Sequence, residues 1–332
     1  MATIGNTVRT LLDVAKSLDP DGRVAKVAEL LSIRNEVLQY MPFVEGNLPT
    51  GHRTTVRTGL PTVAWRLLNG GITPSKSTKA QIDEQCGKLE AWSECDVAIA
   101  KLGGDVGAAR LSEAKAFLEA MNQEFNAVLL YGAATSPEKF VGLAPRYSSL
   151  SAGNSQNVID GGGTGTDNTS VYLTVLGDET LTGIYPKGSA AGLQHNDLGE
   201  QTVTVGTGIG GARMRAYQDQ FVWDCGIALK DWRYVVRLCN IDVSNLIAQS
   251  SAVDLTNKML RMIARVPNLN AGRPVFLMNR TVHEMLTIQR REDVRTGGQL
   301  SYEVVDGIIR WSFMGIPIAC TDSLVLTETR VT

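Results

Sequence analysis

The longest helical pattern in the chain lies at residues 111–131, LSEAKAFLEAMNQEFNAVLLY. Apolar side chains recur there at spacings of three and four residues, which predicts one amphipathic helix. The stripe comprises Leu111, Ala114, Leu118, Met121, Phe125 and Val128. At 1.5 Å per residue such a helix is about 30 Å long, enough to cross a whole domain. We expect it to end at Gly132 and to bury Leu118, Met121 and Phe125 in the core.

A second constraint is the segment at residues 48–79, LPTGHRTTVRTGLPTVAWRLLNGGITPSKSTK. Two β-rich runs, at about 52–58 and 62–68, flank the turn signal TGLP and predict a hairpin. The segment is rich in Thr, Gly, Pro and basic residues and poor in core-sized side chains, so burial against its own domain cannot stabilise it. It is either a loose surface loop or an extended arm that becomes ordered on a neighbouring subunit. The expected contact residues of such an arm, all basic, are Arg53, Arg57, Arg66 and Lys76.

The rest of the chain predicts an α+β fold with antiparallel pairing rather than βαβ repeats. Two amphipathic helical stripes, separated by LDPDG, fill the first 45 residues. After a loop-rich stretch, QFVWDCGIAL and RYVVRLCNI predict two strands joined as a pair by a short link, followed by a helix at about 243–265. The last part reads as the strand RPVFLMN, the helix TVHEMLTIQ and the strands GIIRWSFMG and IPIACTD.

Gly206, Gly208 and Gly211 spell the G-x-G-x-x-G of a dinucleotide-binding turn, directly after a β-branched run. That fingerprint needs a helix to open at the third glycine, and an acidic residue about 20 residues further on. Here ARMRAYQDQFVWDCGIAL turns quickly into a β-rich run, and Asp231 falls at a link between strands. The glycines therefore fit turns better than a phosphate site. A nucleotide-dependent oxidoreductase built on this loop stays an alternative of a different class.

Composition and motifs indicate no other binding or catalytic site. The formal net charge is −2, which does not indicate a general polyanion binder. No apolar run approaches the ~20 residues of a membrane span, and the N-terminus has no secretory signal pattern. The five cysteines are scattered, as is typical of reduced thiols in a cytosolic protein. Three distant histidines and unclustered acidic residues predict no metal site, and we expect no catalytic residues and no cofactor.

Taken in order, these segments resemble the major capsid proteins of tailed bacteriophages, which have the Hong Kong 97-type fold. GHRTTVRTGLPTVAWRLLNGG followed by LEAWSECDVAIAKL resembles the extended hairpin called the E-loop and its return into the peripheral (P) domain. EAKAFLEAMNQEFNAVLLYG, then PEKFVGL, resembles the long spine helix of that domain. FVWDCGIALKDWRYVVRLCNID and GIPIACTDSLVLTE resemble strand pairs of the axial (A) domain and of the C-terminus.

The resemblance implies a division of the chain into five parts. They are an N-terminal arm at 1–46, an E-loop at 47–80, a P domain at 81–136 with the spine helix at about 111–131, a mainly A-domain segment at 137–300, and C-terminal strands at 301–332. The glycine loop then lies in the A domain. The family often carries a long N-terminal scaffolding segment, whereas only about 45 residues precede the E-loop here, so scaffolding would need a separate protein.

The implied function is that of a non-enzymatic head protein, which self-assembles from hexamers and pentamers into an icosahedral shell around double-stranded DNA. The implied partners are other copies of the chain, a scaffolding protein, a portal, a decoration protein, and DNA enclosed without sequence-specific binding. The implied location is the virion, assembled in the host cytoplasm and without membrane contact. An encapsulin-like compartment shell, loaded with enzyme cargo, is an alternative that shares the fold.

Overall fold

The structure is a computed structural model that describes residues 36–102, 105–205, 212–249, 252–292, 300–305 and 308–332. The chain forms two compact units that interleave along the sequence. The small unit includes Lys88–Phe125 and Gly192–Asp224, and the large unit comprises Arg34–Gly87, Asn126–Ala191 and Cys225–Thr332. The two helical stripes expected in the first 45 residues lie almost entirely outside the described residues. In the described part, no helix combines the length and the apolar character that crossing a membrane requires.

The large unit is built around β5, Asn168–Leu176, all nine residues of which are buried. β5 pairs antiparallel with β10, Arg273–Met278, on one side and with β9, Val235–Asp242, on the other. Beyond these neighbours the sheet continues through β13 (Ile316–Cys320), β12 (Ile308–Phe313) and β11 (Leu300–Val305) at one edge, and through β4 (Val158–Asp160) at the other. The β10–β13 and β4–β9 pairs are parallel, so parallel pairs accompany the expected antiparallel ones and the sheet is mixed.

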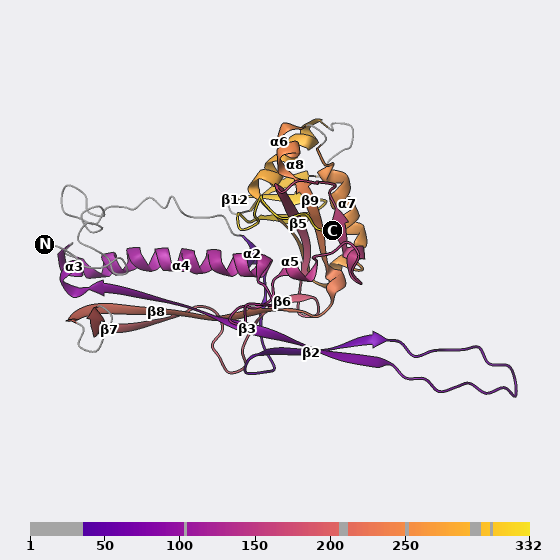
Figure 1. Ribbon diagram of the computed structural model, residues 1–332, viewed down its shortest axis with the longest axis horizontal. Coiled ribbons are helices and arrows are strands. Elements are labelled where there is room, and N and C mark those ends of the chain that lie inside the picture. Colours follow the sequence, from indigo (N-terminus) through magenta and orange to yellow (C-terminus); the bar gives the residue numbers. More distant parts are fainter. Residues whose placement is uncertain (1–35, 103–104, 206–211, 250–251, 293–299, 306–307) are drawn as a thin grey trace. The chain divides into compact units, whose positions relative to one another are not determined.

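Helices α6 (Val243–Ala248), α7 (Leu255–Arg265) and α8 (Arg280–Glu292) belong to the same unit and supply apolar side chains to its core (Figure 1). The single helix expected at about 243–265 is therefore two helices. α6 ends at Gln249, which adopts a left-handed conformation (φ 53°), and α7 begins after Asp254, whose side chain accepts a bond from the Asn257 amide. The core cluster includes Val171, Leu173, Val236, Leu238, Leu246, Met259, Met262, Phe276 and Leu286.

A second pairing region of the large unit surrounds β6, Leu181–Tyr185. β6 pairs in parallel with β1, Phe43–Glu45, and antiparallel with the end of β8, from Gly226 to Leu229. β8 and β9 are both strands, as expected, but they pair with different partners rather than with each other. The short helical elements are α2 (Val37–Tyr40), α5 (Leu143–Arg146), η1 (Ser155–Asn157), η2 (Trp232–Tyr234) and η3 (Leu269–Ala271).

In the small unit, α4, whose full bounds are Val106–Tyr131, packs on the hairpin of β7 (Gln194–Val205) and β8 (Ala212–Leu229). α3, Val97–Leu102, and the end of β3, Thr78–Asp96, precede it. The expected long helix is present and starts five residues earlier than expected. Met121 and Phe125 are buried, and the Phe125 ring stacks on Trp223 with centroids 4.6 Å apart.

Leu118 is 39% exposed, so its assignment to the core is wrong. The buried face of α4 runs through Phe117, which stacks on Phe221, and then Met121 and Phe125. Leu118 lies one position, or about 100°, away from that line. Further back on the same face, Arg110 binds Asp219 with 2.7 Å between their charged atoms, and this contact helps to set the helix rotation that leaves Leu118 exposed.

Candidate assembly interface

The hairpin arm, defined here as residues 47–80, is the feature that the sequence singled out for contact with a neighbour. β2, Gly51–Gly59, pairs antiparallel with β3 from Gly51 opposite Gln85 to Gly59 opposite Thr78. The second strand therefore begins at Thr78, and the strand expected at 62–68 is wrong. Residues 60–77 form instead a long open loop (Figure 1). Pro61 and Pro74 have no amide hydrogen for a strand ladder, which explains part of this difference.

The base of the arm is tied to the large unit by a buried ion pair. Arg146 donates two hydrogen bonds of 2.6 Å, one to each carboxylate oxygen of Glu84, and the Glu84 side chain is only 8% exposed. A Cβ atom at Gly51 would collide with the carbonyl oxygen of Glu84, so this position requires glycine. These contacts fix the base of the arm to α5 of the same unit.

The four basic residues expected to contact a neighbour have different surroundings. Arg53 forms paired bonds of 2.6 Å with Asp83 across the hairpin, so its charge is already matched within the arm. The Asp83 hydrogen bonds and charge raise the pKa of Arg53, and the hydrogen bonds from Arg53 lower the pKa of Asp83. Arg57, Arg66 and Lys76 are exposed, and no ion pair of the described chain involves them. Their contact with a second subunit stays a prediction.

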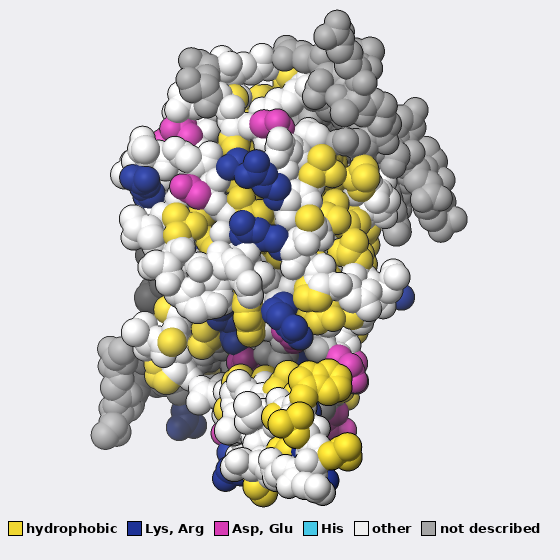
Figure 2. Space-filling model, turned by 90° about the vertical axis from the view of Figure 1, so that its right-hand side faces the viewer, with side chains coloured by type: hydrophobic (Ala, Val, Ile, Leu, Met, Phe, Trp, Pro, Cys, Tyr) yellow, Lys and Arg dark blue, Asp and Glu magenta, His cyan; other side chains and the backbone are white. Residues whose placement is uncertain are grey.

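Large apolar side chains on the loop at 60–77 were missed by the sequence reasoning. Six of them are exposed: Leu60, Val63, Trp65, Leu67, Leu68 and Ile72. Val63 is 90% exposed, Leu68 95%, and Trp65 fully. The signal was present in the sequence PTVAWRLL, where Val63, Trp65 and Leu67 occupy every second position. Figure 2 looks onto this end of the arm, in its lower part, where hydrophobic side chains lie among polar ones.

The exposed apolar surface of this loop is large for a single subunit. Burying a Val, Leu or Ile side chain contributes about 1.5–3 kcal/mol, so the five of these types on the loop could together contribute roughly 8–15 kcal/mol before the cost of ordering the loop. Within the loop itself, the stabilising contacts include a hydrogen bond of 2.8 Å from Ser75 to the Thr62 carbonyl and a turn in which the Gly70 amide binds the Leu67 carbonyl. Several large exposed apolar side chains on one loop are typical of a contact site for another protein.

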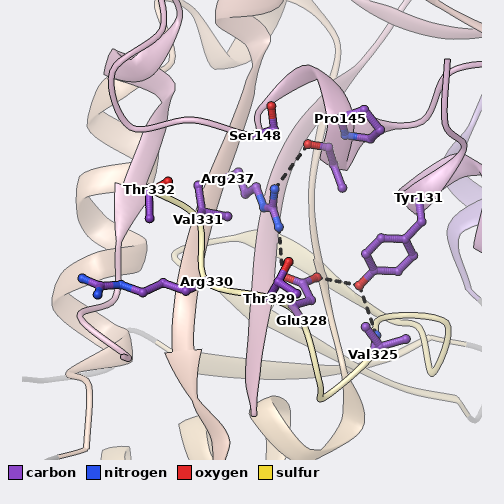
Figure 3. A pocket seen from close by; sticks show the side chains of 11 residues that line it. Tyr131, Pro145, Ser148, Arg237, Val325, Glu328, Thr329, Arg330, Val331 and Thr332 are labelled. Carbon is purple, nitrogen blue, oxygen red and sulfur yellow. Dashed lines mark hydrogen bonds and ion pairs between the residues drawn. The ribbon is translucent and has the colours of Figure 1, made fainter. Parts of the chain in front are cut away.

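A shallow pocket of about 400 Å³ in the large unit lies beside the last residues of the chain (Figure 3). Its floor is a buried ion pair between Arg237 and Glu328, each with a side chain 5% exposed and 2.9 Å between the charged atoms. Tyr131 donates to Glu328 at 2.5 Å, and Ser170 also binds this carboxylate. Arg237 further donates to Ser170 and to the carbonyls of Ala144 and Tyr147. These buried groups satisfy one another, and they fasten the C-terminal segment to the rest of the large unit.

The glycine motif of Gly206, Gly208 and Gly211 lies outside the described residues. β7 ends just before it, β8 begins just after it, and Val205 is paired with Ala212. The motif is therefore followed by a strand and not by the helix that a dinucleotide-binding turn requires. In the described part of the chain, no group of three or more His, Cys, Asp or Glu side chains could hold a metal ion.

Comparison with known proteins gives one strong and several weak similarities. A family model described as "Major capsid protein GP7" matches residues 19–332. The capsid protein in a cryo-EM structure of bacteriophage Epsilon15 is 32% identical, with a TM-score of 0.76 and coverage of 100% of both chains. The bacteriophage JBD30 capsid is 9% identical, with a TM-score of 0.47 over 90% of this chain and 96% of that one. A native GTA particle capsid is 9% identical, with a TM-score of 0.45 over 68% and 95%. No curated protein sequence matches the chain.

Proposed function

Because the chain belongs to the major capsid protein GP7 family, and so is a phage head shell protein of the Hong Kong 97-type fold, we propose that its hairpin arm joins neighbouring subunits of the shell. In this proposal residues 47–80 act as the E-loop. The same division assigns 81–136 to a P domain, 137–300 mainly to an A domain, and 1–46 and 301–332 to the terminal arm and strands.

The exposed apolar loop is the observation that carries the proposal. Leu68 and Trp65 are almost wholly exposed in the isolated subunit, and a lone hairpin of this length is marginal in water. Contact with a second copy would bury these side chains and order the loop at the same time. Charge has a smaller part than the sequence suggested, since Arg53 is matched by Asp83 within the arm, while Arg57, Arg66 and Lys76 remain available for a neighbour's carboxylates.

The other parts of the proposed function rest on the same family membership. Hexamers and pentamers of this chain form an icosahedral shell that encloses double-stranded DNA, and the shell forms in the host cytoplasm. A separate scaffolding protein, a portal and a decoration protein complete the head. The subunit has a structural and not a catalytic function, and its family is that of phage heads rather than of enzyme compartments or oxidoreductases.

Serine substitutions on the arm test the proposal. We expect the triple variant Trp65→Ser, Leu67→Ser, Leu68→Ser to fold with an unchanged melting temperature, because these three side chains are exposed in the isolated subunit and are not part of its core. It should form no large particles in dynamic light scattering or negative-stain electron microscopy. The matched control is Thr62→Ala with Thr73→Ala, which changes two exposed polar side chains of the same loop, keeps its apolar side chains and should still assemble. Full-sized shells from the triple variant would contradict the proposed role of the loop.

A further inference from the structure

A stretch of the large unit is strongly basic although the whole chain has a net charge of −2. Residues 255–283 contain Lys258, Arg261, Arg265, Arg273 and Arg280 and no Asp or Glu. Arg280 pairs with Asp322. The three residues on α7 are not matched in this way, and they form what is called here the α7 basic row: Lys258, Arg261 and Arg265.

The row follows from the helical periodicity of α7. Spacings of three and four residues place the three cations along one side of the helix, about 90° around the axis from the centre of the buried face formed by Leu255, Met259 and Met262. Seven residues separate the ends of the row, which corresponds to about 10 Å along the helix. Figure 2 shows the side of the molecule on which α7 lies in Figure 1, and Lys and Arg side chains gather along the middle of this face.

The cations of the row are held in place without being neutralised. Lys258 donates to the backbone carbonyl of Asp160 at 2.7 Å, and Arg265 donates to the carbonyls of Gln156 and Val158. None of the ion pairs between described residues includes a member of the row. Burial and the positive charge of the nearby Arg261 lower the pKa of Arg265. Like charges thus lie close together, and among the described residues no carboxylate forms an ion pair with them.

A pocket of about 360 Å³ adjoins the end of the row and is lined by Gln156, Asn157, Arg233, Arg265 and Pro267. Arg233 binds Asp231, with 2.7 Å between the closest charged atoms, so this nearby carboxylate is already in use. The only guanidinium of the lining that lacks a carboxylate among the described residues is that of Arg265. The pocket can therefore accept an anionic group beside Arg265.

Helix electrostatics alone do not explain the row. A cation in the last turn of a helix interacts favourably with the helix dipole, which accounts for Arg265. Lys258 lies near the first turn of α7, where the same dipole disfavours a positive charge. The dipole therefore accounts for one end of the row only, and at the other end Lys258 binds the Asp160 carbonyl instead.

We propose that the α7 basic row binds phosphate groups of the packaged nucleic acid without reading its bases. The inference rests on the proposed function, because it needs a shell that encloses nucleic acid. Backbone contacts to nucleic acids are made by Arg, Lys and amide side chains, and the exposed neighbours of the row include Asn257, Asn268 and Asn270. A protein partner would normally need apolar anchors. None of the large exposed hydrophobic residues of the described chain lies between 252 and 273.

Fluorescence anisotropy with a labelled, short, random-sequence DNA duplex tests the proposal in full-length protein over a series of salt concentrations. Relative to wild type, Arg261→Gln with Arg265→Gln should bind about tenfold more weakly at low salt, and the slope of log K against log salt should fall by about 1.8, or 0.9 for each lost phosphate contact. The matched control is Lys115→Gln with Arg213→Gln, two exposed cations of the small unit, and it should bind like wild type. Because Arg265 also holds two carbonyls, Arg261→Gln alone is the second variant, with half the change in slope.

Three results would overturn the inference. The first is that both row variants keep the affinity and the salt slope of wild type. The second is displacement of the duplex by inorganic phosphate at an equal phosphate concentration, which would indicate a small-anion pocket. The third is tighter binding of a polyglutamate peptide than of the duplex, which would indicate an acidic protein partner. Shell formation by the wild-type protein tests the proposed function, and DNA binding measured by anisotropy tests the α7 basic row. Either claim can therefore fail without the other.

Discussion

Strand β5 and the loop at 60–77 both carry large apolar side chains, but their surroundings are opposite. Every residue of β5 is buried between β9 and β10, whereas Leu60, Val63, Trp65, Leu67 and Leu68 in the loop are each more than four-fifths exposed. The apolar content of a segment therefore does not say where its partner lies. For β5 the partner is in the same subunit, and for the loop we propose that it is in the next one.

The largest expected difference between the two regions is in the free energy of unfolding. Phe276 is fully buried beside β5, and its ring meets Phe313 edge-on with centroids 5.9 Å apart. We expect Phe276→Ala to lower the free energy of unfolding by about 3–5 kcal/mol, from lost transfer energy and the cavity left behind. Trp65→Ala should leave it within about 0.5 kcal/mol of wild type. Urea unfolding of unassembled subunits measures the free energy of unfolding of both variants. A similar decrease in the two would show that the loop side chain is as important for subunit stability as the core side chain.

Two ion pairs, one buried in the large unit and one exposed on the arm, are expected to differ in the same way. Glu328→Gln should cost about 3–5 kcal/mol, because it leaves the buried guanidinium of Arg237 without its counter-charge. Asp83→Asn removes the partner of Arg53 in the exposed part of the arm, where solvent screens the pair, and should not change the melting temperature measurably. Equal melting temperatures for the two variants would show that the C-terminal segment is not fastened by this pair.

The smallest expected effect concerns proton release at high pH. Burial, followed by the negative charge of Glu328, raises the pKa of Tyr131 above its usual value of about 10. The folded state then keeps a proton that the unfolded state releases, so this contribution to stability is complete below pH 10 and falls as the pH rises further. Tyr131→Phe should release about one proton fewer on unfolding above pH 10 than wild type. Denaturant titrations at several pH values measure this number, and an unchanged value would contradict the burial of an ionisable Tyr131.

The parts of the fold that the sequence predicted are those with a repeating local pattern. The long helix, the strand RPVFLMN and the helix after it are present because apolar periodicity reflects one buried face. The rotation of α4 was not predictable in this way, because a contact of Arg110 with a residue far along the chain, Asp219, helps to set it. The wrong assignment of Leu118 has this cause.

Pairing between strands was predicted less well, since it depends on partners that are remote in sequence. β9 pairs with β5 rather than with its sequence neighbour β8, and β13 lies parallel to β10. The arm was recognised as a hairpin from its turn residues, but its second strand was placed at 62–68 instead of from Thr78. The overall polar composition of the segment points to its basic residues as contacts and hides its apolar ones. The apolar ones are indicated only by the alternate spacing of Val63, Trp65 and Leu67.

Electron cryo-microscopy of assembled shells tests the central claim most directly, because it shows what covers the loop at 60–77. We predict that the loop lies on a neighbouring subunit and that Trp65 and Leu68 are buried there, while the pairing of β2 with β3 and the Arg146–Glu84 anchor are unchanged. A loop that folds back onto its own subunit, or that stays exposed to solvent in a closed shell, would contradict the account.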